Sequence, residues 1–203
     1  MRFNLAGGCW NPRDTAGSEF LDRGGPSNLV QPDRTVTPDF PFPVSIVSAI
    51  VERQRQGVCE VLVQVRWKPD RDPIYSGTLE IPAGGIELGE SVYEALRREV
   101  FEETGLRVTG FRPEVRTATH SQNGDDVFAF VPFCCQQQLC GRARVGFVFV
   151  CTVEAAEPLP APSEVRQIMW LPTTELKRLL AEAPERIFAL QFPVLQFYLS
   201  QTN

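Results

Sequence analysis

The sequence predicts an α/β fold in which a mixed β-sheet lies between helices, an α/β/α sandwich. Segments rich in β-branched and aromatic residues, which favour strands, recur from residue 44 to residue 171. A charged helix with clear start and stop signals interrupts these segments near residue 91, and further helical stretches follow from residue 172. Helices are therefore expected to cover both faces of one sheet.

Two strands, over residues 44–51 and 58–65, open the folded region. Residues 52–57 join them and end in a glycine, as a turn often does. A polar loop over 70–76 comes next, and residues 78–82 form a short strand that enters a glycine loop. The chain thus approaches its first helix through a hairpin, a loop and a short strand.

The first helix is expected to begin after Ser91 and to end at Gly105. Ser91 followed by Glu94 is a capping box, in which each side chain accepts a backbone N–H of the other residue. Thr104-Gly105 supplies the stop, because glycine accepts the left-handed conformation that the residue after a helix needs.

Strands dominate the region after this helix, and helices close the chain. Strand signals lie at residues 106–118, 126–133, 145–153 and 167–171. Residues 136–144 are expected to turn between the second and third of these strands. A helix over 172–180 should be capped by Thr173 or Thr174, and a last helical stretch over 183–199 should break near Pro193.

Residues 1–40 differ from the rest, because turn-forming residues recur there without apolar periodicity. We interpret them as an irregular N-terminal extension and residues 41–203 as the folded domain. The extension is a candidate for mediating a homodimer.

Composition excludes several classes of protein. The 203 residues are 43% hydrophobic and 22% charged, and the formal net charge is -5. A general nucleic-acid binder would instead present a basic field. No apolar run approaches the ~20 residues that cross a bilayer, so no membrane partner is expected and a cytoplasmic location is the default. The sequence has only one histidine, which leaves little for a zinc site of cysteines and histidines. The six cysteines are therefore expected to be reduced and mostly buried, although Cys134, Cys135 and Cys140 could form a thiolate cluster.

Glu99, Glu102 and Glu103 share one face of the predicted helix, because positions i, i+3 and i+4 are neighbours. Like charges at this spacing repel, and a divalent cation such as Mg²⁺ would reverse that interaction. A solvated acidic face is the alternative interpretation of such a run.

The surrounding positions follow a specific pattern. They are Gly84, Glu90, Arg98-Glu99, Val100, Glu102-Glu103, Gly105 and Leu106. This set resembles the Nudix box and fills each of its fixed positions at the right spacing. The chain therefore resembles a Nudix hydrolase, and a looser resemblance in the order of elements extends over residues 42 to 200.

The resemblance implies a hydrolase that acts on a nucleoside diphosphate linked to another group. It also implies Mg²⁺ or Mn²⁺ held by Glu99, Glu102, Glu103 and the carbonyl group of Gly84. In such enzymes the arginine at the position of Arg98 orients a carboxylate of the box. The chemistry is consistent, since a metal ion neutralises pyrophosphate charge and lowers the pKa of a bound water.

Residues outside the box complete the predicted site. A general base is required, and Glu164 is a candidate beside the box glutamates Glu102 and Glu103, because several related enzymes carry a glutamate in this loop. A solvated loop residue is the alternative for Glu164. Arg66 is a candidate for binding phosphate, although a surface arginine at a strand end is the other interpretation. Trp67 could stack on a base.

Residues 79–84, which include Glu80 as a further substrate-binding candidate, resemble the segment before the box in Nudix enzymes that cleave ADP-ribose. A nucleoside diphosphate sugar is therefore the preferred substrate class. A housecleaning nucleoside triphosphate pyrophosphohydrolase is one alternative, and a non-catalytic nucleotide-sensing Nudix module is another. Such modules commonly lose box carboxylates, whereas this chain has them all.

Overall fold

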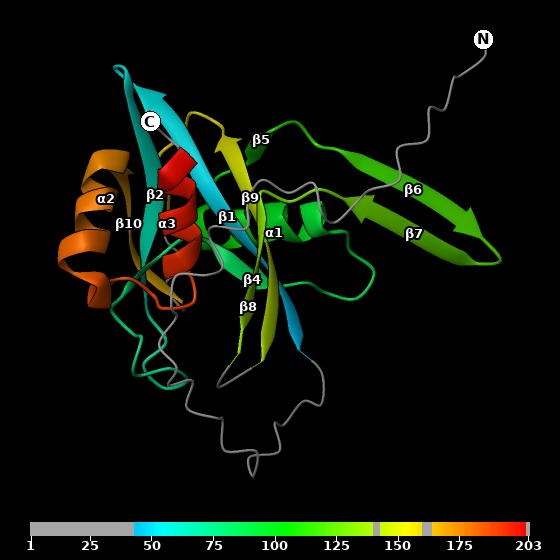
Figure 1. Cartoon of the computed structure of the whole chain (residues 1–203), viewed down its shortest axis with the longest axis horizontal. Coiled ribbons are helices and arrows are strands. Elements are labelled where there is room, and N and C mark those ends of the chain that lie inside the picture. Colours follow the sequence, from blue (N-terminus) through cyan, green and yellow to red (C-terminus); the bar gives the residue numbers. More distant parts are fainter. Residues whose placement is uncertain (1–42, 140–142, 160–163, 202–203) are drawn as a thin grey trace, which may run out of the picture. The chain divides into compact units, whose positions relative to one another are not determined.

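A computed structural model of the protein describes residues 43–139, 143–159 and 164–201 (Figure 1). The predicted N-terminal extension, residues 1–40, lies outside the described residues. Within the described part of the chain, no helix combines the length and apolar character needed to cross a membrane.

The centre of the fold is a sheet with strand order β10-β2-β1-β9-β5. These strands are β1 (Val44–Arg55), β2 (Val58–Arg66), β5 (Val108–Arg112), β9 (Arg144–Val153) and β10 (Val165–Pro172). β1 runs parallel to β9 and antiparallel to β2, so the predicted mixed sheet is confirmed. Three short strands extend it, namely β3 (Leu79–Glu80), β4 (Ala83–Gly85) and β8 (Cys134–Gln138).

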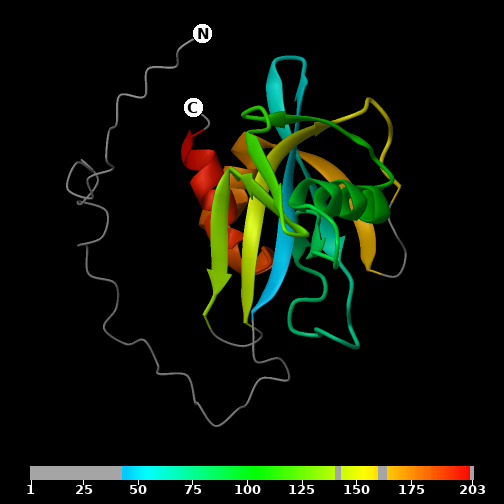
Figure 2. The ribbon, with the colours of Figure 1, turned by 90° about the vertical axis from the view of Figure 1, so that its right-hand side faces the viewer.

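Helices lie on both faces of the sheet (Figure 2). α1 (Val92–Thr104) covers one face, and α2 (Thr173–Glu182) and α3 (Phe192–Gln201) cover the other. Adjacent residues of β1 point to opposite faces, as the period of a strand requires. Ile50 packs with the residues of α2 and α3, whereas Val51 packs with those of α1. The predicted α/β/α sandwich is therefore confirmed.

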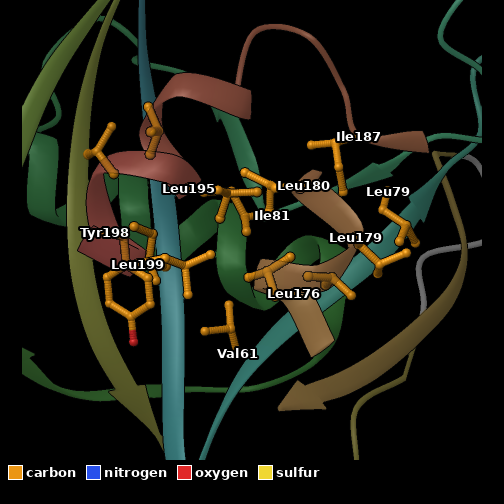
Figure 3. Packing of buried hydrophobic residues seen from close by; sticks show 14 of the residues in the cluster. Val61, Leu79, Ile81, Leu176, Leu179, Leu180, Ile187, Leu195, Tyr198 and Leu199 are labelled. Carbon is orange, nitrogen blue, oxygen red and sulfur yellow. The ribbon is translucent and has the colours of Figure 1, made fainter. Parts of the chain in front are cut away.

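The layer under α2 and α3 is built from aliphatic side chains around one tyrosine (Figure 3). Leu176, Leu195 and Tyr198 are at most 1% exposed. Burying a leucine side chain stabilises the folded state by about 1.5–3 kcal/mol. The Tyr198 hydroxyl donates to Glu52 at 2.7 Å, so the polar end of this buried ring is satisfied.

α1 begins and ends where the sequence predicts. The Ser91 hydroxyl accepts the Glu94 N–H at 3.3 Å, and the Glu94 carboxylate accepts the Ser91 N–H at 2.8 Å. Gly105 adopts φ 72° and donates its N–H to the Phe101 carbonyl group. These caps fix the ends of α1, and with them the position of its carboxylates.

Several predicted boundaries are wrong. The segment 126–133 is divided between β7 (Asp125–Phe130) and the approach to β8, which pairs with β9 and shortens the predicted turn at 136–144. β7 pairs with β6 (Thr117–Gln122) in a hairpin that projects from the body (Figure 1).

The C-terminal helices also differ from the prediction. α2 has Pro172 at its N-cap position and no side-chain cap, so neither threonine serves as one. A short 3₁₀ turn, Pro184–Arg186, precedes α3, which starts at Phe192. Pro193 therefore lies in the first turn of α3, where a missing N–H removes no helical hydrogen bond.

The described cysteines are free thiols, but of these only Cys151 is buried and Cys135 is exposed, so the prediction that they are mostly buried is wrong. Cys151 is fully buried in β9, and burial raises the pKa of its thiol to about 12. Burial likewise raises the pKa of Cys134 to about 11. Cys140 lies outside the described residues, so the alternative of a thiolate cluster stays a prediction.

Candidate active site

The glycine loop, α1 and the start of β10 surround one pocket of about 440 Å³. Its lining combines backbone from β4 with charged side chains, which are Lys68, Glu99, Glu102, Glu103 and Glu164. The structure thus brings Glu164 to the same pocket as the three glutamates of α1, although about 60 residues separate them in the sequence.

Glu103 is the most buried of these carboxylates, with 5% of its surface exposed. Its Oε2 accepts hydrogen bonds from the Gln64 amide at 2.8 Å and from the Ala83 N–H at 3.1 Å. Burial raises the pKa of Glu103 to about 8, and the nearby charge of Glu80 adds to this shift. A cation at this carboxylate would offset the cost of burying its charge.

Arg98 organises the outer part of the pocket. Its guanidinium donates to Glu90 at 2.6 Å, to Glu99 at 2.8 Å and to Glu102 at 3.2 Å. A further bond of 2.9 Å reaches the Gly85 carbonyl group. Glu90 also accepts the Glu87 N–H at 2.7 Å. Arg98 therefore ties the glycine loop to α1 and contacts three carboxylates at once.

Gly84 packs directly against Glu99. A Cβ atom built at Gly84 would overlap the Glu99 carboxyl group, so this close approach requires a residue without a side chain. The backbone of the loop and the carboxylate of the helix consequently line the same pocket.

We expect Gly84→Ala to lower the hydrolytic rate by about 10- to 100-fold, because the added methyl group displaces the Glu99 carboxylate. Overpacking should also lower the free energy of unfolding by about 1–3 kcal/mol. Gly85→Ala is the matched control, since a Cβ there meets nothing within 4 Å. Steady-state kinetics and urea unfolding of both variants check this expectation, and equal effects of the two changes would contradict it.

The donor set suits a hard divalent cation, because carboxylate and carbonyl oxygens are the ligands that Mg²⁺ prefers. Among the described residues, no three histidine, cysteine, aspartate or glutamate side chains already stand in an arrangement that could hold a metal ion. Arg98 engages Glu99 and Glu102, and Gln64 engages Glu103. Ligation therefore requires these side chains to exchange partners.

Glu164 lies in the turn before β10, and its side chain is 39% exposed. Its carboxylate forms an ion pair of 2.6 Å with Lys68, and Arg71 lies 4.0 Å away. The Glu164 carbonyl group accepts the Trp67 N–H at 2.8 Å, which anchors the turn to the end of β2. Two contacts thus hold this glutamate at the rim of the carboxylate pocket.

Arg66 is buried at the end of β2, with 9% of its surface exposed, so the interpretation as a surface arginine is wrong. Its guanidinium pairs with Glu80 at 2.9 Å and with Asp72 at 2.8 Å. The guanidinium also lies over the ring of Phe188, with the Arg66 Cζ atom 4.6 Å from the ring centroid. Burial raises the pKa of Glu80, and the charge of Arg66 opposes that shift. Glu80 therefore holds Arg66 through an ion pair, and both residues line a pocket of about 200 Å³.

Trp67 faces a different environment from Arg66. The guanidinium of Arg166 lies over its ring, with the Arg166 Cζ atom 3.2 Å from the ring centroid. It lines a small pocket of about 220 Å³ together with Arg71 and Glu164. One face of the indole is already occupied, so stacking on a base would use the other face.

Gln64 and Lys68 belong to the site and were missed by the sequence reasoning. Gln64 is fully buried and donates to both Glu103 and Glu80, at 2.8 Å and 3.4 Å. A glutamine inside the otherwise apolar stretch 61–65 was the available signal. Lys68 carried no comparable signal, because a lysine before a loop is ordinary.

The fold and the pocket define an α/β protein with a carboxylate-lined site beside a glycine loop, and comparisons with known proteins identify it further. The model of the NUDIX domain matches residues 42–191. This match spans more than half of the chain. The chain therefore belongs to the Nudix family, and the resemblance seen in the box is confirmed.

Solved structures share the fold at low sequence identity. The Nudix domain of Shewanella oneidensis NrtR, complexed with ADP-ribose, has a TM-score of 0.55 and 14% identity over 81% of this chain and 91% of that one. A MutT Nudix hydrolase from Burkholderia pseudomallei has a TM-score of 0.52 and 17% identity over 80% and 99%. A Nudix-family hydrolase from Clostridium perfringens has a TM-score of 0.52 and 18% identity over the same shares, 80% and 99%. No curated protein matches the sequence.

Proposed function

We propose that this Nudix hydrolase cleaves the pyrophosphate bond of a nucleoside diphosphate sugar such as ADP-ribose, in a reaction that depends on Mg²⁺ or Mn²⁺. The observation that carries the proposal is the convergence of four glutamates on one pocket. That pocket adjoins a second one lined by Arg66, which suits a phosphate. Carboxylates for a cation and an arginine for a phosphate are the two requirements of this chemistry.

Glu99, Glu102, Glu103 and the Gly84 carbonyl group would hold the metal. When bound, the metal would neutralise phosphate charge and acidify a water molecule. Arg98 keeps the carboxylates aligned from the side of the loop.

The remaining side chains would act on the substrate and the attacking water. Arg66, fixed by Glu80 and Asp72, lines the adjoining pocket and would orient a phosphate group there. Glu164, at the rim beside Lys68, would accept the proton of the attacking water.

Two observations support a nucleoside diphosphate sugar as the substrate. Residues 79–84 resemble the approach to the box in enzymes that cleave ADP-ribose. The buried pair of Arg66 and Glu80, which this segment supplies in part, sits between the carboxylate pocket and a larger pocket of about 790 Å³. That volume is within the range of small-molecule sites.

Incubation of the full chain with Mg²⁺ or Mn²⁺ and a panel of nucleotides, followed by chromatography, tests the proposal. ADP-ribose should yield AMP and ribose 5-phosphate, and a chelator should abolish the reaction. Release of pyrophosphate from nucleoside triphosphates at higher kcat/KM would favour the housecleaning enzyme. Tight nucleotide binding without turnover would instead favour the sensing module.

A homodimer is the further proposal for the assembly, and a cytoplasmic location stays a prediction. Light scattering distinguishes a dimer from a single chain of 22.7 kDa. A mass equal to one chain would remove the proposed dimer.

A further inference from the structure

Lys68 lies in the loop after β2 and lines three neighbouring pockets. They are the carboxylate pocket, the adjoining pocket of about 200 Å³ that Arg66 also lines, and the larger pocket of about 790 Å³. Among the described lining residues, Lys68 alone borders all three. Its side chain therefore stands where the carboxylate pocket meets the pocket proposed for a phosphate.

The Lys68 ammonium group is paired with one acid. Its nitrogen, Nζ, lies 2.6 Å from Glu164 Oε2, and the side chain is 20% exposed. An ammonium group has three N–H donors and no acceptor. Within the described part of the chain, Glu164 is the one acid that forms an ion pair with Nζ. The pair with a single carboxylate thus leaves N–H donors for an acceptor in the pockets that Lys68 lines.

The loop fixes Lys68 relative to Glu164. The Lys68 N–H donates to the Ser76 hydroxyl at 3.2 Å, and the Lys68 carbonyl group accepts the Asp72 N–H at 2.8 Å. The preceding N–H, of Trp67, donates to the Glu164 carbonyl group at 2.8 Å. One backbone contact and one ion pair therefore join the Lys68 loop to the turn that carries Glu164.

The charge around Lys68 suits this position. Four glutamates line the carboxylate pocket, and Lys68 is the one cationic side chain among its described lining residues. A pyrophosphate that enters brings further negative charge to these carboxylates. An ammonium group at the border of the two pockets offsets part of that repulsion and can contact a phosphate oxygen directly.

We propose that Lys68 is a substrate-binding residue that also positions Glu164. Its ammonium group contacts an oxygen of the pyrophosphate and at the same time holds the carboxylate that accepts the proton of the attacking water. This inference rests on the proposed function and assigns a further residue of the same site. A shared contact of this kind sets the distance between base and phosphate, and such positioning is a large part of phosphoryl-transfer catalysis.

Kinetics of Lys68→Met tests both parts of the inference. Loss of the phosphate contact should raise KM by about 10-fold, and loss of the hold on Glu164 should lower kcat by about 10-fold. Lys177→Met is the matched control, because Lys177 is an exposed lysine on α2 that lines none of the three pockets. The control should leave kcat and KM unchanged, and melting curves check that both variants fold.

A double-mutant cycle separates positioning from a merely structural role. In a Glu164→Gln background, Lys68→Met should still raise KM, whereas it should lower kcat little further, because the positioned base is already lost. An unchanged KM in Lys68→Met, or the same loss of kcat in both backgrounds, would overturn the inference and leave the proposed function standing.

Chemical labelling tests the phosphate contact in the unchanged protein. Of the 20 lysine and arginine residues of the chain, only Lys68 and Lys177 are lysines, so an amine-selective reagent has Lys177 as its internal reference. Methylenediphosphonate, a pyrophosphate analogue that cannot be hydrolysed, should slow the labelling of Lys68 and leave that of Lys177 unchanged in the presence of Mg²⁺. Equal effects at the two lysines would overturn the inference. If no nucleotide is hydrolysed, the proposed function fails, and this labelling alone decides the role of Lys68.

Discussion

Glu103→Gln is expected to abolish turnover and to leave the fold intact. The carboxylate is 5% exposed and lines the pocket, so the amide would remove one negative charge from the proposed metal site at constant shape. Removal of one well-placed electrostatic contact costs about 10²- to 10³-fold in kcat, and loss of a metal would cost more. Steady-state kinetics with Mg²⁺ measures the loss.

The stability of the Glu103→Gln protein should not fall, although its activity is lost. Burial and the neighbouring charges of Glu80 and Glu99 all disfavour the ionised form of Glu103. A glutamine carbonyl oxygen can still accept the hydrogen bonds from Gln64 and Ala83, so the melting temperature should stay equal or rise.

Glu94→Gln serves as the control for Glu103→Gln, because Glu94 belongs to the same helix and glutamine can still complete the capping box. This control should keep its activity. A Glu103→Gln protein with nearly normal kcat would remove Glu103 from the metal site.

The helix that carries the site could be predicted from sequence because its signals are local. Ser91 and Glu94 satisfy each other across three residues, and Gly105 ends the helix by its own conformational freedom. The face shared by Glu99, Glu102 and Glu103 follows from helical geometry alone. Local rules of this kind need no knowledge of the tertiary structure.

The layer beneath the carboxylates could not be predicted, because it is made by contacts between distant segments. Gln64 joins Glu80 and Glu103, which lie 16 and 39 residues further along the chain. Whether Arg66 is exposed or buried likewise depends on Phe188, which is far from Arg66 in the sequence. No periodicity within a single strand contains that information.

The ends of one strand and of the last helix were predicted wrongly for a related reason. Residues 126–133 have a uniform β-propensity, yet residues 126–130 pair with β6 in a separate hairpin. Pro193 was interpreted as a break within a helix. It lies in the first turn of α3, where a proline is tolerated. In both cases the residue type is compatible with two structures, and tertiary packing decides between them.

Glu164→Gln is expected to lower kcat by about 10²- to 10⁴-fold, the range for losing a general base. Affinity for the metal and KM should stay nearly unchanged, since the contact to the attacking water strengthens in the transition state. The ion pair with Lys68 places the carboxylate at the rim of the pocket, and a glutamine oxygen can still accept from that lysine. Loop packing should therefore survive, which a melting curve checks.

Glu154→Gln and Glu157→Gln are the controls, because both residues carry the same charge and lie earlier in the proline-rich segment before β10. The acidic limb of the pH–rate profile should shift or vanish in Glu164→Gln and persist in the controls, since that limb reports the base. If all three variants behave alike, or if Glu164→Gln keeps most of its kcat, the base must lie among the box residues. Glu102 and Glu103 would then be the first to test, because both line the same pocket as Glu164.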